Sequence, residues 1–160
     1  MSGGDVKPGE LRLEGALPAD ATLAFIGRIR SDWRPGDCPS NLRIARERGG
    51  GGARLEIDAP FRPALEGLQP GTGLVVLYWL DRARRDLLRQ HPRHRDAPVG
   101  TFALRSPVRP NPVALAAVRC TALDIARGVV ELDAIDALDD TPVLDIKPWL
   151  ASVDVLPDWG

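Results

Sequence analysis

Proline and glycine recur so often along this chain that they limit every regular element to a short stretch. The 160 residues include 15 prolines and 16 glycines. A proline inside a helix removes a backbone hydrogen bond and clashes with the preceding turn, and glycine raises the entropic cost of a regular element. We therefore expect no long helix. The apolar residues that remain fall in short runs, which favours a mainly β fold.

Several of these runs alternate apolar and polar residues, as half-buried strands do. Strands are predicted at residues 11–17, 23–29, 54–57, 74–80, 99–104, 113–123, 129–135 and 143–146. Short helices that would cap a barrel are predicted at 62–68 and 82–90, the second ending before Pro92. The segment RGGGGA, residues 48–53, lacks side chains to anchor it and is expected to be a mobile surface loop.

Length and composition favour one compact domain over residues 1–160. With 44% hydrophobic residues, the chain can bury one sizeable core. No apolar run approaches the roughly 18 residues that span a bilayer, and the opening MSGGDVKPGE lacks the features of a signal peptide. We expect a soluble, cytoplasmic protein without membrane contact.

Several kinds of site are disfavoured by the motifs that the sequence lacks. Cys38 and Cys120 form no CxxC pair, so both are expected to be ordinary buried thiols. Pro92 between His91 and His94 disfavours the helical geometry of paired metal ligands, so no metal site is predicted. Neither GxGxxG nor GxxxxGK[ST] occurs, which argues against a Rossmann site or a P-loop.

Charge is distributed unevenly, although the net charge is only −1. Residues 82–109 hold eight arginines against Asp86 and Asp96, whereas residues 131–160 hold eight acids against Lys147. Two interpretations stay open. The two regions attract each other as solvated faces, or the arginine-rich region binds the phosphates of RNA.

The segment RSPVRPNP, residues 105–112, is stiffened by its three prolines. It holds Arg105 and Arg109 with little freedom left to lose on binding a carboxylate, a phosphate or a base. The alternative is an edge segment whose arginines pair with the acidic end of the chain.

A second segment, residues 136–149, reads DALDDTPVLDIKPW. A turn at residues 139–142 would offer donors and acceptors to an adenine edge or to ribose hydroxyls. Asp145 and Lys147 lie two residues apart, so in a strand they share one face and can pair. The alternative is an Asx-type turn followed by an edge strand.

Two tryptophans stand beside charged or turn residues. Trp33 and Trp149 would each present an aromatic face for stacking on a base, or would be buried at a subunit interface.

Taken together, these segments resemble the TsaA-like (YaeB-like) family of tRNA methyltransferases. The family pairs an ATRSxxRPNPIG-like segment with a DGTPVxDIKPY-like segment, and here they read FALRSPVRPNPVAL and DDTPVLDIKPW. The order of the FIGRIRS, CPSN, APF and LVVLYWL segments also fits. The resemblance covers roughly residues 25–150, nearly the whole chain.

The resemblance implies a single small β-barrel domain, with its core at about residues 23–150, that binds S-adenosyl-L-methionine (SAM). It also implies a homodimer with the site close to the subunit interface. Characterised bacterial members methylate the exocyclic amino nitrogen of threonylcarbamoyl-adenosine beside the tRNA anticodon, so tRNA is the expected partner. The alternatives are a methyltransferase of a small metabolite and a non-catalytic SAM-binding module.

Carried over by motif, the cofactor-binding residues fall in four groups. They are Leu42 and Arg43; Leu80 and Asp81; Arg105, Asn111, Pro112 and Leu115; and Asp140, Thr141, Pro142 and Val143. The amide-like nitrogen of the acceptor is a poor nucleophile, so a nearby base would help, and Asp145 or Lys147 is the catalytic candidate. This chain departs from the family pattern at Asp140, where the family carries glycine.

Overall fold

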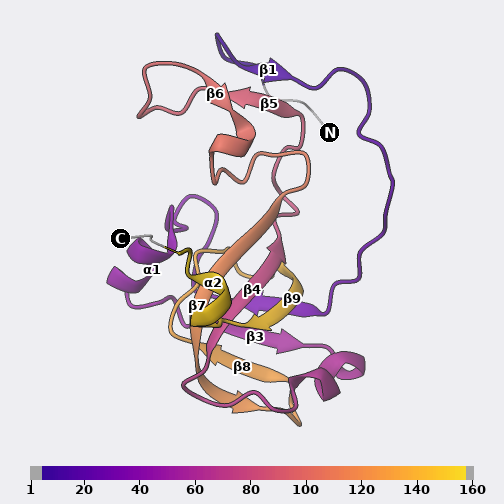
Figure 1. Ribbon diagram of the computed structural model, residues 1–160, viewed down its shortest axis with the longest axis vertical. Helices are drawn as coiled ribbons and strands as arrows, with labels where there is room; N and C mark the ends of the chain where they lie inside the picture. The colour runs from indigo at the N-terminus through magenta and orange to yellow at the C-terminus, as the bar shows by residue number, and fades with distance from the viewer. Residues whose placement is uncertain (1–4, 158–160) are drawn as a thin grey trace. The chain divides into compact units, whose positions relative to one another are not determined.

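The structure, a computed structural model, describes residues 5–157 and is mainly β (Figure 1). In chain order the elements are β1 (Leu11–Arg12), β2 (Gly27–Arg30), α1 (Leu42–Glu47), β3 (Arg54–Ile57), the 3₁₀ helix Ala59–Leu65, β4 (Gly73–Trp79), β5 (Leu87–Gln90), β6 (Val99–Gly100), the 3₁₀ helix Thr101–Ala103, β7 (Val113–Asp124), β8 (Val129–Leu132), β9 (Pro142–Pro148) and α2 (Ala151–Asp154). Within residues 5–157, no helix has the length and apolar character needed to cross a membrane.

The described chain divides into two compact units. The barrel unit comprises residues 23–79 and 115–157, and its strands close in the order β2-β3-β8-β7-β4-β9. The small-sheet unit comprises residues 5–22 and 80–114 and contains the three-stranded sheet β1-β5-β6. Closure leaves the barrel strands without an unpaired edge. The predicted fold class, a small β-barrel with short helices, is confirmed.

Alternation along the strands separates the core of the barrel from its outer surface. In β4 every second residue is buried, namely Leu74, Val76 and Tyr78. Ile29 of β2 and Val143 of β9 are fully buried as well. Because side chains alternate between the two faces of a strand, the residues between these positions point outward. The outward residues of β2 are Arg28 and Arg30, which become important for the site.

The predicted helix at residues 82–90 is wrong, because Leu87–Gln90 is the central strand of the small sheet. Thr101 explains the difference: its Oγ1 donates to the Leu87 carbonyl at 2.8 Å and accepts from the side-chain Nε2 of Gln90 at 2.9 Å. Gln90 Nε2 also donates to the Val108 carbonyl at 2.7 Å. Strand pairing and this buried network outweigh the local helical preference.

Other boundaries differ by a few residues. The strands predicted at 11–17, 99–104 and 129–135 are shorter, and the strand at 143–146 extends over Pro142–Pro148. The helix expected at 62–68 begins earlier and is a 3₁₀ helix, Ala59–Leu65. Neither α1 nor α2 was predicted. Asn41 begins α1, since its side chain accepts a hydrogen bond from the Ile44 amide at 3.0 Å.

The glycine run at residues 49–52 is a packed turn, so the expectation of a mobile surface loop is wrong. All four glycines have positive φ angles, 86°, 81°, 76° and 57° in order. The Gly50 amide donates to the Ala45 carbonyl at 2.8 Å, and the Gly51 carbonyl accepts from the Asp32 amide at 2.8 Å. Only glycine adopts this backbone repeatedly without strain, so the run encodes a specific turn.

Trp33 packs against this turn. Its side chain is 5% exposed, and its Nε1 donates to the Ile135 carbonyl at 2.7 Å. A Cβ atom placed on Gly51 would lie 2.3 Å from Cε2 of the indole. The indole is therefore a core group in contact with bare backbone, and the idea that Trp33 stacks on a base is wrong.

Gly51→Ala should destabilise the protein by about 2–4 kcal/mol, because it adds an overpacking clash to the cost of a left-handed alanine. Gly49→Ala is the matched control: its φ is 86°, but a Cβ there meets nothing within 4 Å. The control should lose only about 1–2 kcal/mol. Urea unfolding measures both, and equal losses would contradict the close contact with Trp33.

Candidate functional site

The turn that precedes β9 forms hydrogen bonds with both backbone groups of Ile29 in β2, the amide and the carbonyl. The Asp140 amide donates to the Ile29 carbonyl at 2.9 Å, and the Ile29 amide donates to the Thr141 carbonyl at 2.8 Å. Within the turn, Thr141 Oγ1 donates to the Leu138 carbonyl at 2.7 Å. Two backbone bonds to a fully buried residue fix the turn relative to the barrel.

Asp140 has a φ of 68°, and among residues 5–157 no other non-glycine residue has a positive φ. Asparagine and aspartate tolerate this region better than most residues. The carboxylate forms an ion pair with Arg30, with Nη1 and Oδ1 3.0 Å apart. Its carbonyl oxygen accepts from Arg28 Nη1 at 3.3 Å. The two outward arginines of β2 thus hold the residue that replaces the family's glycine.

Arg30 also links this turn to β3. Its Nε lies 2.9 Å from Oε2 of Glu56, whose other oxygen accepts from Arg54 Nη2 at 2.9 Å. The hydrogen bond from Arg30 lowers the pKa of Glu56, against the opposing effect of burial. A carboxyl with a lowered folded-state pKa stabilises the fold above its ordinary pKa of 4.5. That contribution is lost as the pH falls through the lower, folded-state pKa.

The other members of the predicted turn are buried. Thr141 is 5% exposed, and Pro142 and Val143 are less than 2% exposed. Their side chains therefore set the shape of the turn. Asp140, with 56% of its side chain exposed, is the member that presents a polar group to solvent.

The predicted pair on β9 is confirmed as a pair. Lys147 Nζ lies 2.8 Å from Oδ2 of Asp145, and Oδ1 of Asp145 accepts from the Ile146 amide at 2.9 Å. Both residues lie beside β4, where Asp145 is opposite Leu77. An ammonium group has no lone pair, so Asp145 is the member that can accept a proton.

The other predicted cofactor residues of the barrel unit lie on α1 and β7. Leu42 and Arg43 occupy the first turn of α1, and Arg43 forms an ion pair with Glu47 one turn later. Leu115 of β7 is 46% exposed and points outward, because Ala116 beside it is buried.

In the small-sheet unit, the structure joins two of the predicted groups. The Leu80 amide donates to the Pro112 carbonyl at 2.9 Å, which brings Leu80 and Asp81 to the end of the proline segment. Asn111 Oδ1 accepts from Arg85 Nη2 at 3.2 Å. These four predicted residues therefore form one local group.

The arginines of the proline segment differ in their surroundings. Arg109 Nη1 donates to the carbonyls of Leu104 and Ser106, at 3.0 and 3.1 Å, so it stiffens its own segment. Arg105 is exposed. The predicted cofactor residues are thus distributed over both units.

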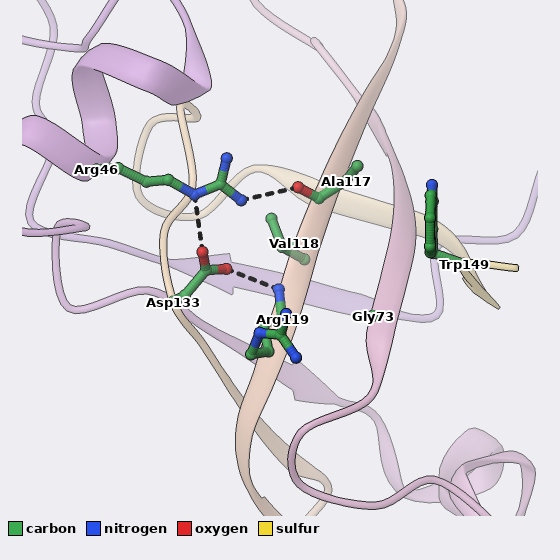
Figure 2. A pocket seen from close by; sticks show the side chains of 7 residues that line it. All are labelled: Arg46, Gly73, Ala117, Val118, Arg119, Asp133 and Trp149. Carbon is green, nitrogen blue, oxygen red and sulfur yellow. Dashed lines mark hydrogen bonds and ion pairs between the residues drawn. The ribbon is translucent and has the colours of Figure 1, made fainter. Parts of the chain in front are cut away.

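A shallow pocket of about 340 Å³ on the barrel wall contains none of the predicted cofactor or catalytic residues (Figure 2). Gly73 and Ala117 line it with little side-chain bulk, and Trp149 and two arginines stand around them. Asp133 joins the arginines: Oδ2 lies 2.8 Å from Arg46 Nε, and Oδ1 accepts from the Arg119 amide at 2.7 Å. These bonds preform the pocket.

Burial is the main cause that raises the pKa of Cys38 to about 11, so the thiol is protonated at neutral pH. Between residues 5 and 157, no group of three or more His, Cys, Asp or Glu side chains is placed to hold a metal ion.

Sequence reasoning missed Arg28 and Arg30, the residues that grip the Asp140 turn. A usable signal was present, because Arg28 lies in the strand predicted at residues 23–29 and Arg30 follows that strand directly, so the two arginines alternate with Gly27 and Ile29. Two cations on the outer face of one strand favour acidic partners on a neighbouring segment.

Comparison with known proteins gives a consistent result. The family model described as the tRNA-methyltransferase O N-terminal domain matches residues 29–155. A probable S-adenosyl-L-methionine-binding protein of Archaeoglobus fulgidus is 40% identical over 133 residues, covering 82% of this chain and 35% of that protein. The tRNA (adenine(37)-N6)-methyltransferase of Escherichia coli is 29% identical over 144 residues, covering 83% of this chain and 59% of the enzyme.

Solved structures agree with this similarity. The crystal structure of TrmO from Pseudomonas aeruginosa superposes with a TM-score of 0.68 at 31% identity, over 86% of this chain and 60% of that one. The chain therefore spans about a third of the first A. fulgidus relative and three fifths of the solved TrmO chain.

The ion pair between Arg30 and Asp140 should contribute about 0.5–1 kcal/mol of coupling, because both side chains are partly exposed. Urea unfolding of Arg30→Met, Asp140→Asn and the double variant measures it. Asparagine is chosen because it tolerates the left-handed backbone. The cycle of Arg30→Met with Asp124→Asn is the control and should be additive. Equal coupling in the two cycles would rule out a specific link to the turn.

Proposed function

The chain belongs to the tRNA-methyltransferase O N-terminal domain family, and from this premise we propose that it binds SAM and methylates tRNA. The acceptor we propose is the exocyclic amino nitrogen of threonylcarbamoyl-adenosine beside the anticodon. The observation that carries the proposal is the family match over residues 29–155. Relatives named as SAM-binding proteins support the cofactor, and the E. coli relative named as a tRNA adenine methyltransferase supports the acceptor.

The side chains of the predicted site fit the chemistry of SAM. This cofactor has a cationic sulfonium, an amino-acid end with a carboxylate and an ammonium group, and an adenosine. Within the barrel unit, Asp140 and Arg43 are partly exposed although each has an ion-pair partner, Arg30 and Glu47, so each can share its charge with a ligand group of opposite charge. Leu115 exposes an apolar surface for an adenine. The buried Thr141, Pro142 and Val143 hold the backbone that presents Asp140.

When bound, SAM supplies an activated methyl group that an acceptor nitrogen can attack in line. The protein then has to align the acceptor and remove one proton. We assign proton removal to Asp145, whose carboxylate has acceptor lone pairs and is held in place by Lys147 and the Ile146 amide. Lys147 is the positioning partner in this scheme, because its ammonium group holds the carboxylate at 2.8 Å.

We also propose that the chain forms a homodimer. The segment that follows β9 exposes a run of large apolar side chains: Trp149 at 39%, Leu150 at 49%, Val153 at 71%, Val155 at 51% and Leu156 at 61%. Large apolar side chains exposed close together along the chain favour an interaction site. Sedimentation equilibrium measures the oligomeric state directly.

Arg105→Ala should weaken SAM binding by about 1.5–3 kcal/mol, because the role proposed for the exposed Arg105 guanidinium is a charge-assisted contact with the cofactor. Isothermal titration calorimetry measures the affinity, and far-UV circular dichroism verifies the fold. Arg127→Ala, an exposed arginine at the turn before β8, is the control and should bind SAM normally. Unchanged affinity in a folded Arg105→Ala protein would refute the role of Arg105.

The acceptor is tested by mass spectrometry of tRNA nucleosides from cells with and without the protein. We expect methylated threonylcarbamoyl-adenosine only when the protein is present, and a loss of roughly 100-fold or more in transfer rate for purified Asp145→Asn. Methyl transfer to a small metabolite, with tRNA left unmodified, would replace the tRNA proposal. SAM binding without transfer to any acceptor would identify a SAM-binding module.

A further inference from the structure

The small sheet has an irregular central strand that puts neighbouring residues on the same face. Between Leu11 and Arg12 of β1, the partner on β5 changes from Arg89 to Leu87, so Leu88 is an extra residue. Leu87 and Gln90 are buried, whereas Leu88 and Arg89 are exposed. An extra residue of this kind is a β-bulge, which turns two successive side chains toward one face. Leu88 and Arg89 therefore share the solvent face.

The neighbours of Arg89 leave this face open. Arg89 pairs with Leu11 on one side, which is 48% exposed, and with Gly100 on the other, which has no side chain. Thr101 then points inward to the Leu87 carbonyl. The next residue, Phe102, is 82% exposed, more than any other large hydrophobic residue in the described chain.

Phe102 lies close to Arg89. Two residues span at most about 7 Å between the Cα atoms of Gly100 and Phe102, and paired strands add about 5 Å between Gly100 and Arg89. The Cα atoms of Phe102 and Arg89 therefore lie within about 12 Å of each other. Exposing a phenylalanine ring to water is unfavourable, so the position is better explained by a partner that covers it.

The loop between β5 and β6 adds two more cations in a fixed turn. The Arg95 amide donates to the Pro92 carbonyl at 3.0 Å, and the Arg95 carbonyl lies 3.1 Å from His91 Nε2. Arg93 and Arg95 are both exposed. Among residues 5–157, neither of them nor Arg89 has a carboxylate within ion-pair distance.

The two units differ in the sign of their net charge. The described small-sheet unit has ten basic and seven acidic side chains, a formal charge of +3, whereas the described barrel unit has eleven basic and fourteen acidic side chains, a formal charge of −3. An anionic partner is therefore favoured at the small sheet. Arginines beside an exposed aromatic ring suit a polyanion that also carries planar bases.

We propose that the face formed by Leu88, Arg89, Arg93, Arg95 and Phe102, here called the small-sheet face, binds a single-stranded loop of RNA. Phe102 stacks on an unpaired base, and the three arginines contact phosphates. A duplex does not fit, because its bases are stacked on one another and present no free face to an aromatic ring. This inference rests on the proposed function, since it names the surface that would hold the tRNA.

The test measures binding of the full chain to an anticodon stem-loop RNA and to a duplex of equal length by filter binding across salt concentrations. Phe102→Ala should weaken stem-loop binding by roughly 5- to 100-fold and affect duplex binding little. The triple variant Arg89→Gln, Arg93→Gln, Arg95→Gln should reduce the slope of log K against log salt by about 2. Unchanged unfolding midpoints verify that each variant is folded.

Matched controls lie on the barrel unit. Phe61→Ala removes a phenylalanine that is 36% exposed, and Arg127→Gln removes an exposed arginine. Both should bind the stem-loop like the original chain. If the small-sheet variants also keep full affinity while the original chain binds the stem-loop, the inference is wrong and the proposed function stands.

Other outcomes separate the remaining explanations. No binding of the original chain to tRNA at low salt would overturn both this inference and the proposed tRNA acceptor. If Phe102→Ala lowers the molar mass measured by light scattering but leaves RNA affinity unchanged, the face joins two copies of this chain, and the RNA assignment is wrong.

Discussion

The hydrogen bonds between Ile29 and the Asp140 turn hold the candidate site to the barrel. Ile29 is fully buried, and its amide and carbonyl bind Thr141 and Asp140. The same strand points Arg28 and Arg30 outward, where they bind the carbonyl and the carboxylate of Asp140. One short strand thus anchors the turn through its backbone, fills the core with one face and supplies counter-charges with the other. The Asp140 turn is therefore held by β2 through both backbone and side-chain contacts.

In the sequence, the larger part of the small-sheet unit lies between β4 and β7, two long strands of the barrel. The chain leaves the barrel after β4 and returns along β7, and the hydrogen bond from Leu80 to Pro112 joins the two ends of the excursion. Candidate cofactor residues lie at both ends. The candidate residues lie both on barrel elements and in the excursion itself, so the proposed cofactor role constrains the sequence of both. The separation of charge between the units follows the same division.

Pattern reasoning succeeded where a strand is long or strictly alternating and failed where tertiary contacts decide. Residues 54–57 were predicted without error, and β4 and β7 to within one residue at each end. The β5 strand was mistaken for a helix, because only its pairing and Thr101 make it extended. The closed barrel and the cofactor residues came from the family resemblance. The pairing of Asp145 with Lys147 came from spacing alone, whereas the roles of Arg28 and Arg30 required the position of Asp140.

The turn at residues 49–52 shows that a repetitive sequence can be strictly required by the backbone path it follows. Four successive residues with positive φ trace a path of the opposite hand from the one that L-amino acids prefer. Glycine is achiral, so a run of it is the one coded solution to such a path. The repetition of glycine in this segment is therefore a stereochemical requirement. Each position of this run therefore limits substitution by its handedness, whether or not a side chain would have room.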